Sequence, residues 1–312
     1  MRRSSVECCS WLGQDKRATS HCQKVGAAPR ALRTLIRSAF GGDGLACVAA
    51  VRGIVLACVL ALAPTLTRAA PHAPQERFDR VVIDAGHGGD DHGARGPAGL
   101  LEKDLVLDLA QRLAKKLRAQ GIEARLTRDA DAFVALDERT RSANAAAADL
   151  FVSIHANASR AKSIRGIETF FASPEASDEA AQELAQAENA AFGPGAAKLA
   201  EGDPVLAILG DLLATEQLAD SQEFARIAQA ELARSAERRS RGVKQAPFVV
   251  LMGVRMPAVL VEVGFITNPQ DERALRKASE RERIAAGLAR AIAAFQSRQD
   301  ERSGVASAGG RR

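Results

Sequence analysis

Short apolar runs rich in valine and isoleucine alternate along the chain with longer stretches in which leucine recurs at helical spacing. The run V-V-I at 81–83 has the composition of a buried strand and ends in a polar, glycine-rich turn. In the stretch 103–120, four leucines four residues apart, starting at Leu105, form one stripe. Gly121 follows the stripe, where a glycine commonly ends a helix. The pattern predicts a strand, a turn and a helix in that order.

The same alternation continues to residue 171 and predicts an α/β fold, with a single layered domain built on a mostly parallel central sheet and helices on both faces. After the first strand and helix, the elements expected from the sequence are a strand at 122–128, a helix at 136–148 and strands at 149–154 and 166–171.

Residues 173–242 break this rhythm and predict a helical insertion. Helical stretches are expected at 178–191, 203–218 and 221–239, with Gly-Pro-Gly at 193–195 between the first two. Strands are expected again at 247–251 and 258–266, and then a closing helix at 270–296. Residues 298–312 are polar and glycine-rich, which predicts a disordered tail.

The start of the chain is typical of an export signal. An apolar run at 53–63 follows Arg52 and precedes small residues at Ala69 and Ala70. A membrane span needs about 20 apolar residues, so this run is too short for one. We expect a leader over residues 1–70, a linker at 71–78, a catalytic domain at 79–297 and no stable membrane span after cleavage; an uncleaved anchor is the alternative.

Charge and cysteine content divide at the same place. The first 70 residues hold ten of the 43 basic residues and three of the 38 acidic ones, so the rest of the chain has two more acids than bases. The net charge of +5 is therefore no reason to expect a nucleic-acid partner. All five cysteines also precede residue 70, which excludes a cysteine nucleophile, a thiolate zinc site and a disulfide in a processed chain.

Two histidines stand directly after predicted strands. His87 lies in the turn G-H-G-G and His155 follows D-L-F-V-S-I, so both are expected at the carboxyl edge of the sheet, where α/β proteins bind ligands. Glu102 opens the helix after the first turn and can face the same edge. Two imidazoles and one carboxylate suit zinc and leave a fourth position for water. Taken singly, His155 could be a core histidine and Glu102 a helix N-terminal carboxylate.

Glu262 is the other unusual acid, because it lies within the apolar strand A-V-L-V-E-V-G-F. A carboxylate in a buried strand is costly unless it is paired or functional. It is a candidate general base and proton donor beside a metal-bound water, and a structural ion pair is the alternative.

Four motifs in this order resemble the zinc-dependent N-acetylmuramoyl-L-alanine amidases, in particular the catalytic domain of the bacterial cell-separation enzymes. The motifs are D-A-G-H-G-G, L-L-E-K-D-L, S-I-H-A-N and V-E-V-G-F-I-T-N-P, and the likeness covers nearly all of 80–296. The resemblance implies that His87, Glu102 and His155 bind Zn²⁺ and that Glu262 is catalytic.

The implied reaction is hydrolysis of the amide between N-acetylmuramic acid and L-alanine in peptidoglycan, for wall remodelling and daughter-cell separation in the periplasm. Asn157 and Arg141 are expected to line or brace the site. Two other functions stay open at this point: a catalytically silent peptidoglycan-binding or regulatory module, and a zinc peptidase that cuts elsewhere in the stem peptide.

The insertion at 173–242 resembles the helical segment that blocks the site in some relatives until an activator protein displaces it. Within it, D-L-L-A-T-E-Q-L-A-D-S suggests Glu216 as the inhibitory carboxylate that reaches the zinc. Peptidoglycan and an activator protein are therefore the expected partners.

Overall fold

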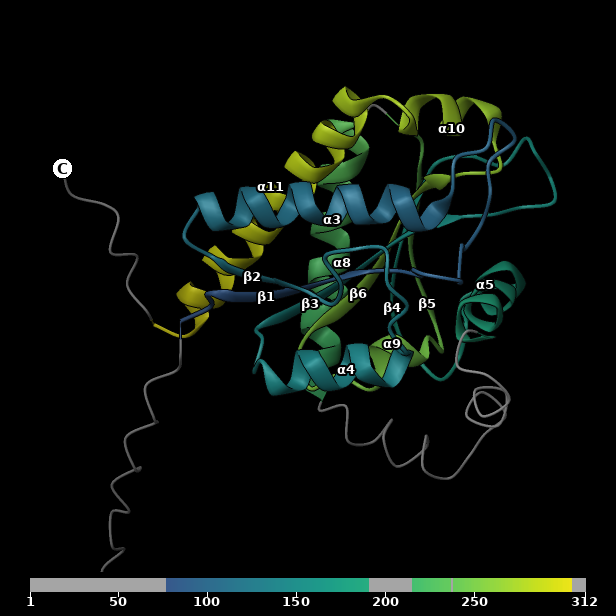
Figure 1. Ribbon diagram of the computed structural model, residues 1–312. Coiled ribbons are helices and arrows are strands. Elements are labelled where there is room, and N and C mark those ends of the chain that lie inside the picture. Colours follow the sequence, from purple (N-terminus) through teal and green to yellow (C-terminus); the bar gives the residue numbers. More distant parts are fainter. Residues whose placement is uncertain (1–76, 191–214, 237, 305–312) are drawn as a thin grey trace, which may run out of the picture. The chain divides into compact units, whose positions relative to one another are not determined.

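A computed structural model describes residues 77–190, 215–236 and 238–304. Its centre is a six-stranded sheet in the order β2-β1-β3-β6-β4-β5, with helices on both faces (Figure 1). This confirms the predicted α/β class. The strands are β1 (Arg80–Ala85), β2 (Glu123–Leu126), β3 (Leu150–Asn157), β4 (Ile167–Ala172), β5 (Ser240–Ala246) and β6 (Ala258–Phe265); the helices are α3 (Glu102–Ala119), α4 (Leu136–Ala145), α5 (Glu179–Asn189), α8 (Thr215–Ser235), α9 (Val249–Met252), α10 (Pro269–Leu275) and α11 (Ala278–Arg302).

Strand direction changes once in the sheet. β2, β1, β3 and β6 run parallel to one another, whereas β4 is antiparallel to β6 and parallel to β5. The carboxyl ends of β1, β3 and β6 therefore share one edge with the amino-terminal ends of β4 and β5. This reversal decides which side chains can meet at that edge.

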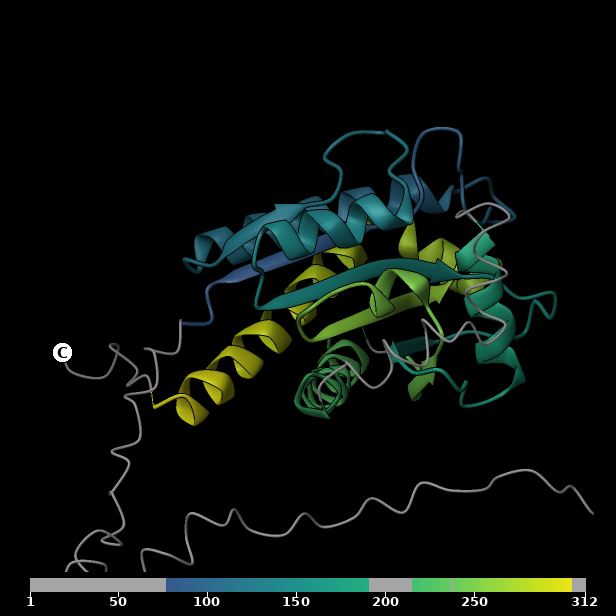
Figure 2. The same ribbon diagram turned by 90° about the horizontal axis from the view of Figure 1, so that it is seen from below.

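Alternate residues of each strand pack on opposite faces of the sheet, as the two-residue repeat requires. Val81 and Ile83 pack with the leucines of α3 and with α8 and α11, while Val82 packs with Phe151, Phe170 and the residues of α4 and α9 on the other face. In Figure 1, α3 and α11 lie on one side of the strands and α4 and α9 on the other, and in Figure 2, seen from below, α4 and α9 lie in front of the strands. Helices thus cover both faces of the sheet, and the carboxyl ends of β1, β3 and β6 are left for ligands.

The structure differs from the expected elements in two places near residue 247. The polar segment S-R-G-V-K-Q-A is the edge strand β5, because its backbone pairs with β4 although its side chains are mostly half-exposed. The segment predicted as a strand at 247–251 instead contains the short helix α9, which packs Val250 and Leu251 under the sheet. Pairing and burial outweigh intrinsic propensity here.

The closing helix is two helices. Asn268 caps α10 by accepting hydrogen bonds from the backbone N–H groups of Gln270 and Asp271. Lys277 has an extended backbone that separates α10 from α11, and α11 then continues to Arg302, past the expected start of the tail at 298.

Helix α8, which lies within the stretch predicted as a helical insertion at 173–242, is part of the core. Its Phe224, Ala225, Ala228 and Leu232 are fully buried against the sheet and α11. The expected leader, linker start and most of the helical stretch at 203–218 lie outside the described residues. Among the helices that the structure describes, none has the length and apolar character to cross a membrane.

Candidate metal centre and active-site cleft

The turn after β1 is held open by two buried arginines. Arg128 donates hydrogen bonds to the carbonyl oxygens of Ala85 (2.9 Å) and Gly86 (2.8 Å). Arg139 donates to the carbonyls of Ala85 (2.6 Å) and His87 (2.8 Å). His87 has a positive φ of 57°, which is rare for a residue with a Cβ. The two guanidinium groups therefore fix the backbone that aims the His87 ring.

Asp84 anchors Arg139 from inside the sheet. Its Oδ1 lies 2.7 Å from Arg139 Nη1, and its two oxygens accept hydrogen bonds from the Thr127 and Ser153 hydroxyls, both at 2.7 Å. Burial acts to raise the pKa of Asp84, but the Arg139 charge and these hydrogen bonds outweigh it and lower the pKa from 3.8. Asp84 is thus a charged partner of Arg139.

His87 presents Nε2 to the site and anchors its other nitrogen. Nδ1 lies 2.9 Å from Asp91 Oδ2, which is the carboxylate partner that metal-binding histidines commonly have. Nε2 is buried, has no hydrogen-bond partner among the described residues and lies 3.1 Å from Glu102 Oε1. A buried nitrogen lone pair beside a carboxylate is what a bound cation would satisfy.

Glu102 is 2% exposed and is fixed through both oxygens. Oε2 accepts a hydrogen bond from the Ala94 N–H (2.8 Å), and Oε1 accepts one from the Ala156 N–H (2.9 Å). Oε1 also lies 3.1 Å from His155 Nδ1. Burial raises the pKa of Glu102, but the neighbouring His87 charge and the histidine hydrogen bonds lower it overall, so this carboxyl is ionised.

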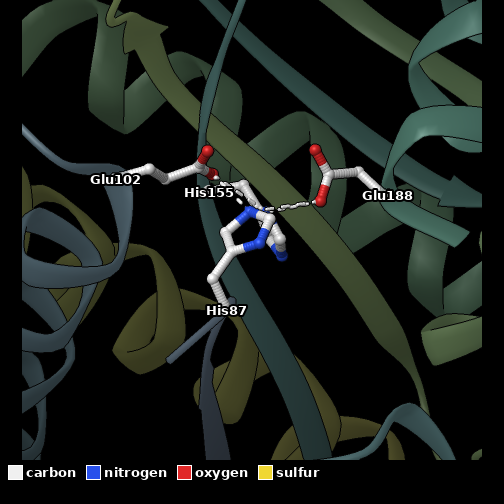
Figure 3. A group of neighbouring side chains, drawn as sticks. All are labelled: His87, Glu102, His155 and Glu188. Atoms are coloured by element: carbon white, nitrogen blue, oxygen red, sulfur yellow. Dashed lines mark hydrogen bonds and ion pairs between the residues drawn. The ribbon is translucent and has the colours of Figure 1, made fainter. Parts of the chain in front are cut away.

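A fourth ligand candidate, Glu188, comes from the last turn of α5 (Figure 3). Its Oε2 lies 3.0 Å from His155 Nδ1 and 3.4 Å from His87 Nε2. One ligand atom from each of His87, Glu102, His155 and Glu188 falls within 4.8 Å of the others. This arrangement is small enough for a single metal ion.

Glu188 was missed by the sequence analysis, which chose Glu216 instead. The sequence around Glu188, A-Q-E-L-A-Q-A-E-N, is that of an ordinary amphipathic helix. Only the position of α5 brings Glu188 to the histidines. The Glu216 side chain lies outside the described residues, so its expected role stays a prediction.

The donor set fits zinc, and the site is tightly packed. Burial acts to lower the pKa of His87, but Glu102 and Asp91 raise it to about 10. The pKa of His155 is also raised, because Glu188 and Glu102 outweigh burial. The carboxylates thus favour positive charge here, either a proton or a metal ion. A Cβ on Gly86 would lie 2.3 Å from His155 Cε1, so the residue before His87 has to be glycine.

Glu262 stands beside His155 in the paired strands β6 and β3 and is completely buried. Neither of its oxygens has a hydrogen-bond partner in the described structure. Burial raises the pKa of Glu262 well above 4.5, and the negative charges of Glu188 and Glu102 add to this effect despite His155. A carboxyl of this kind beside a candidate metal site is a candidate proton carrier.

A cleft of about 950 Å³ opens beside these residues. It is lined by three of the ligand candidates (His87, Glu102 and Glu188), by Asn157 and Glu168, and by Arg160 and Arg241. Asn157 is therefore at the site, as expected. Arg141 is not brought there: it lies on the exposed side of α4, paired with Asp137, because two residues along a helix turn a side chain to the opposite side. Arg139 is the residue of that helix that faces the turn.

The sequence model of the N-acetylmuramoyl-L-alanine amidase family matches residues 81–294, well over half of the chain. The chain belongs to this family.

Known members of the amidase family agree in sequence and in fold. AmiA of Escherichia coli K12 is 38% identical over 217 residues, which are 69% of this chain and 75% of AmiA. AmiC of Neisseria meningitidis is 35% identical over 68% of this chain and 51% of its own length. The amidase structure from Clostridium difficile 630 gives a TM-score of 0.55 at 27% identity over 71% of this chain and 98% of that one. The CwlV catalytic domain gives 0.55 at 28% identity, over 70% and 98%.

Proposed function

We propose that this amidase is a zinc hydrolase that cleaves the amide between the lactyl group of N-acetylmuramic acid and L-alanine in peptidoglycan. The observation that carries the proposal is the meeting of His87, Glu102 and His155 beside a buried, unpartnered Glu262. The names of AmiA, AmiC and the solved amidases support the choice of bond.

His87 Nε2, His155 Nδ1 and Glu102 Oε1 would hold the zinc, which supplies a Lewis acid and a bound water whose pKa is lowered toward ~7. Asp91 keeps the His87 ring in place from behind. Glu262 would take a proton from water and deliver it to the leaving amine of L-alanine, because its carboxyl is buried next to His155 and burial raises its pKa, which favours proton uptake.

Glu188 would inhibit this enzyme from within. Its carboxylate lies within 4.8 Å of the other three ligand atoms, so it would compete with water for a bound metal ion. Among the described residues, helix α5 is held to the domain by buried Ala181 and Ala185, by a Lys244–Asp178 ion pair of 3.1 Å, and by hydrogen bonds of Asn189 with Pro247 and Val249. An activator protein that binds α5 could therefore displace it at modest cost.

The protein would act in the periplasm, exported by the leader at 1–70 and processed near Ala69 or Ala70. The apolar run at 53–63 supports this, as does the position of every cysteine before residue 70.

The test is digestion of purified sacculi by the zinc-loaded protein, followed by mass spectrometry. Freed stem peptides that begin with L-alanine support the amidase, whereas cuts elsewhere in the peptide would indicate a zinc peptidase, and binding without products a silent wall-binding module. Glu262→Gln should release these products about 10²- to 10⁴-fold more slowly while the zinc content stays at one ion per chain.

A comparison of variants tests the inhibitory role of Glu188. Glu188→Gln should raise basal activity, and the matched variant Glu179→Gln, at the exposed start of the same helix, should not. Glu216→Ala is measured alongside. If Glu216→Ala activates and Glu188→Gln does not, the inhibitory carboxylate is Glu216.

A further inference from the structure

The cleft beside the metal centre ends in a positively charged residue that the hydrolysis itself does not use. Arg241 lies near the start of edge strand β5, and Glu168 lies near the start of β4. Because β4 and β5 run against β6, their first residues share an edge with the metal ligands. Both residues line the cleft.

Glu168 connects this end of the cleft to the catalytic carboxyl. It stands directly opposite Glu262 in the β4–β6 register, and Glu262 stands beside His155. The three side chains thus form a row across adjacent strands, two strand spacings wide, or roughly 10 Å. A peptide that leaves the metal centre along this row passes Glu168 and Arg241 within its first two or three residues, at about 3.5 Å per residue.

Arg241 is held in one orientation. Its Nε donates to Glu168 Oε1 at 2.8 Å, and its guanidinium lies over the Phe265 ring, 5.2 Å from the ring centre. Its side chain keeps 25% of its surface exposed, toward the cleft. Among the described residues no partner is found for its two terminal NH₂ groups, so the outer edge of the guanidinium can receive a ligand.

Glu168 also contacts other side chains, so its negative charge neutralises the positive charge of Arg241 only in part. Its carboxylate also lies 2.8 Å from Lys244 Nζ and accepts a hydrogen bond from Asn157 Nδ2 at 3.1 Å. Glu168 is 2% exposed and acts as a fixed brace between two cations. A fixed guanidinium with a free outer edge matches a carboxylate, which it can bind through two parallel hydrogen bonds.

We propose that Arg241 binds a carboxylate of the peptide half of the substrate, so that the cleft between α5 and β5 is the peptide subsite. This rests on the proposed function, in which the leaving group is an acidic peptide that begins with L-alanine. Arg241 selects that peptide and sets the direction in which the substrate crosses the metal centre. The glycan then lies on the other side of the metal centre.

The experiment compares two muramyl dipeptides whose glutamate side-chain carboxyl is blocked as an amide and which differ in one group: N-acetylmuramyl-L-alanyl-D-glutamate, with a free α-carboxylate, and its D-isoglutamine analogue, in which that carboxylate is also an amide. Rates are measured with zinc-loaded protein in the Glu188→Gln background, which is expected to raise basal activity, and again in the otherwise wild-type chain. The parent protein should prefer the acid. Arg241→Gln should raise KM for the acid about 10- to 100-fold, leave kcat nearly unchanged, and leave the amide analogue unaffected.

Two further variants complete the test. Arg241→Lys should recover part of the preference, because it keeps the charge and loses the two-pronged geometry. Arg125→Gln, on the far strand β2, should behave as the parent. If Arg241→Gln slows both dipeptides equally, or neither, the carboxylate role is refuted while the amidase assignment stands. If the parent cleaves neither dipeptide nor sacculi at the lactyl–alanine bond, the proposed function itself fails.

Discussion

Removing the guanidinium of Arg139 should both destabilise the domain and loosen the metal centre. Arg139 is 2% exposed and joins Asp84 inside the sheet to the backbone carbonyls of Ala85 and His87. Arg139→Met keeps most of the side-chain volume but leaves the Asp84 charge buried without its partner.

The magnitude follows from this geometry. Breaking one side of a buried ion pair typically costs 3–5 kcal/mol, because the remaining charge stays desolvated. For a domain of this size, each kcal/mol lowers Tm by about 2–4 °C, so the expected loss is roughly 6–20 °C. Metal affinity should fall about 10- to 100-fold, as it does when groups that orient metal ligands are removed.

The assay pairs thermal unfolding with chelator competition for zinc. The matched control is Arg141→Met, two residues along the same helix, whose side chain is 72% exposed and should change stability by less than about 0.5 kcal/mol. The double variant Asp84→Asn/Arg139→Met should be more stable than Arg139→Met alone, since it removes the unpaired charge.

The pH dependence gives a further check. Folding lowers the pKa of Asp84, so its contribution is present above 3.8 and is lost as the pH falls through the lower folded value. The gap between wild type and Arg139→Met should therefore shrink in acid. The reasoning is refuted if Arg139→Met unfolds within 2 °C of wild type, or if Arg141→Met is the more damaging of the two.

Three shorter predictions concern the metal site. Gly86→Ala should lose zinc, measured by elemental analysis, because the new Cβ would lie 2.3 Å from the His155 ring; retention of one zinc per chain would contradict the packing. Glu262→Gln should slow hydrolysis about 10²- to 10⁴-fold and raise Tm, because a raised pKa means that burial of this carboxyl opposes folding at neutral pH. Zinc affinity should rise with pH from 6.5 to about 10, since the metal displaces a proton that is favoured on His87; calorimetry in buffers of different ionisation enthalpy should detect proton release, and a pH-independent affinity would refute this.

Local sequence was sufficient for the parts of the molecule whose signal is local. The V-V-I run, the leucine stripe after Glu102 and the apolar run around Glu262 appear as β1, α3 and β6. Because strands of this kind end at one edge of a sheet, the positions of His87 and His155 could be predicted, and the structure brings them together with Glu102.

Tertiary structure alone decided the remainder. Nothing local in S-R-G-V-K-Q-A favours a strand, and β5 forms only because β4 offers an edge to pair with. Glu188 and Arg241 look like ordinary surface residues in sequence; the packing of α5 and the reversed direction of β4 and β5 bring them to the cleft. Periodicity records which side of an element is buried, whereas the meeting of side chains distant in sequence depends on strand order and direction, which no single segment encodes.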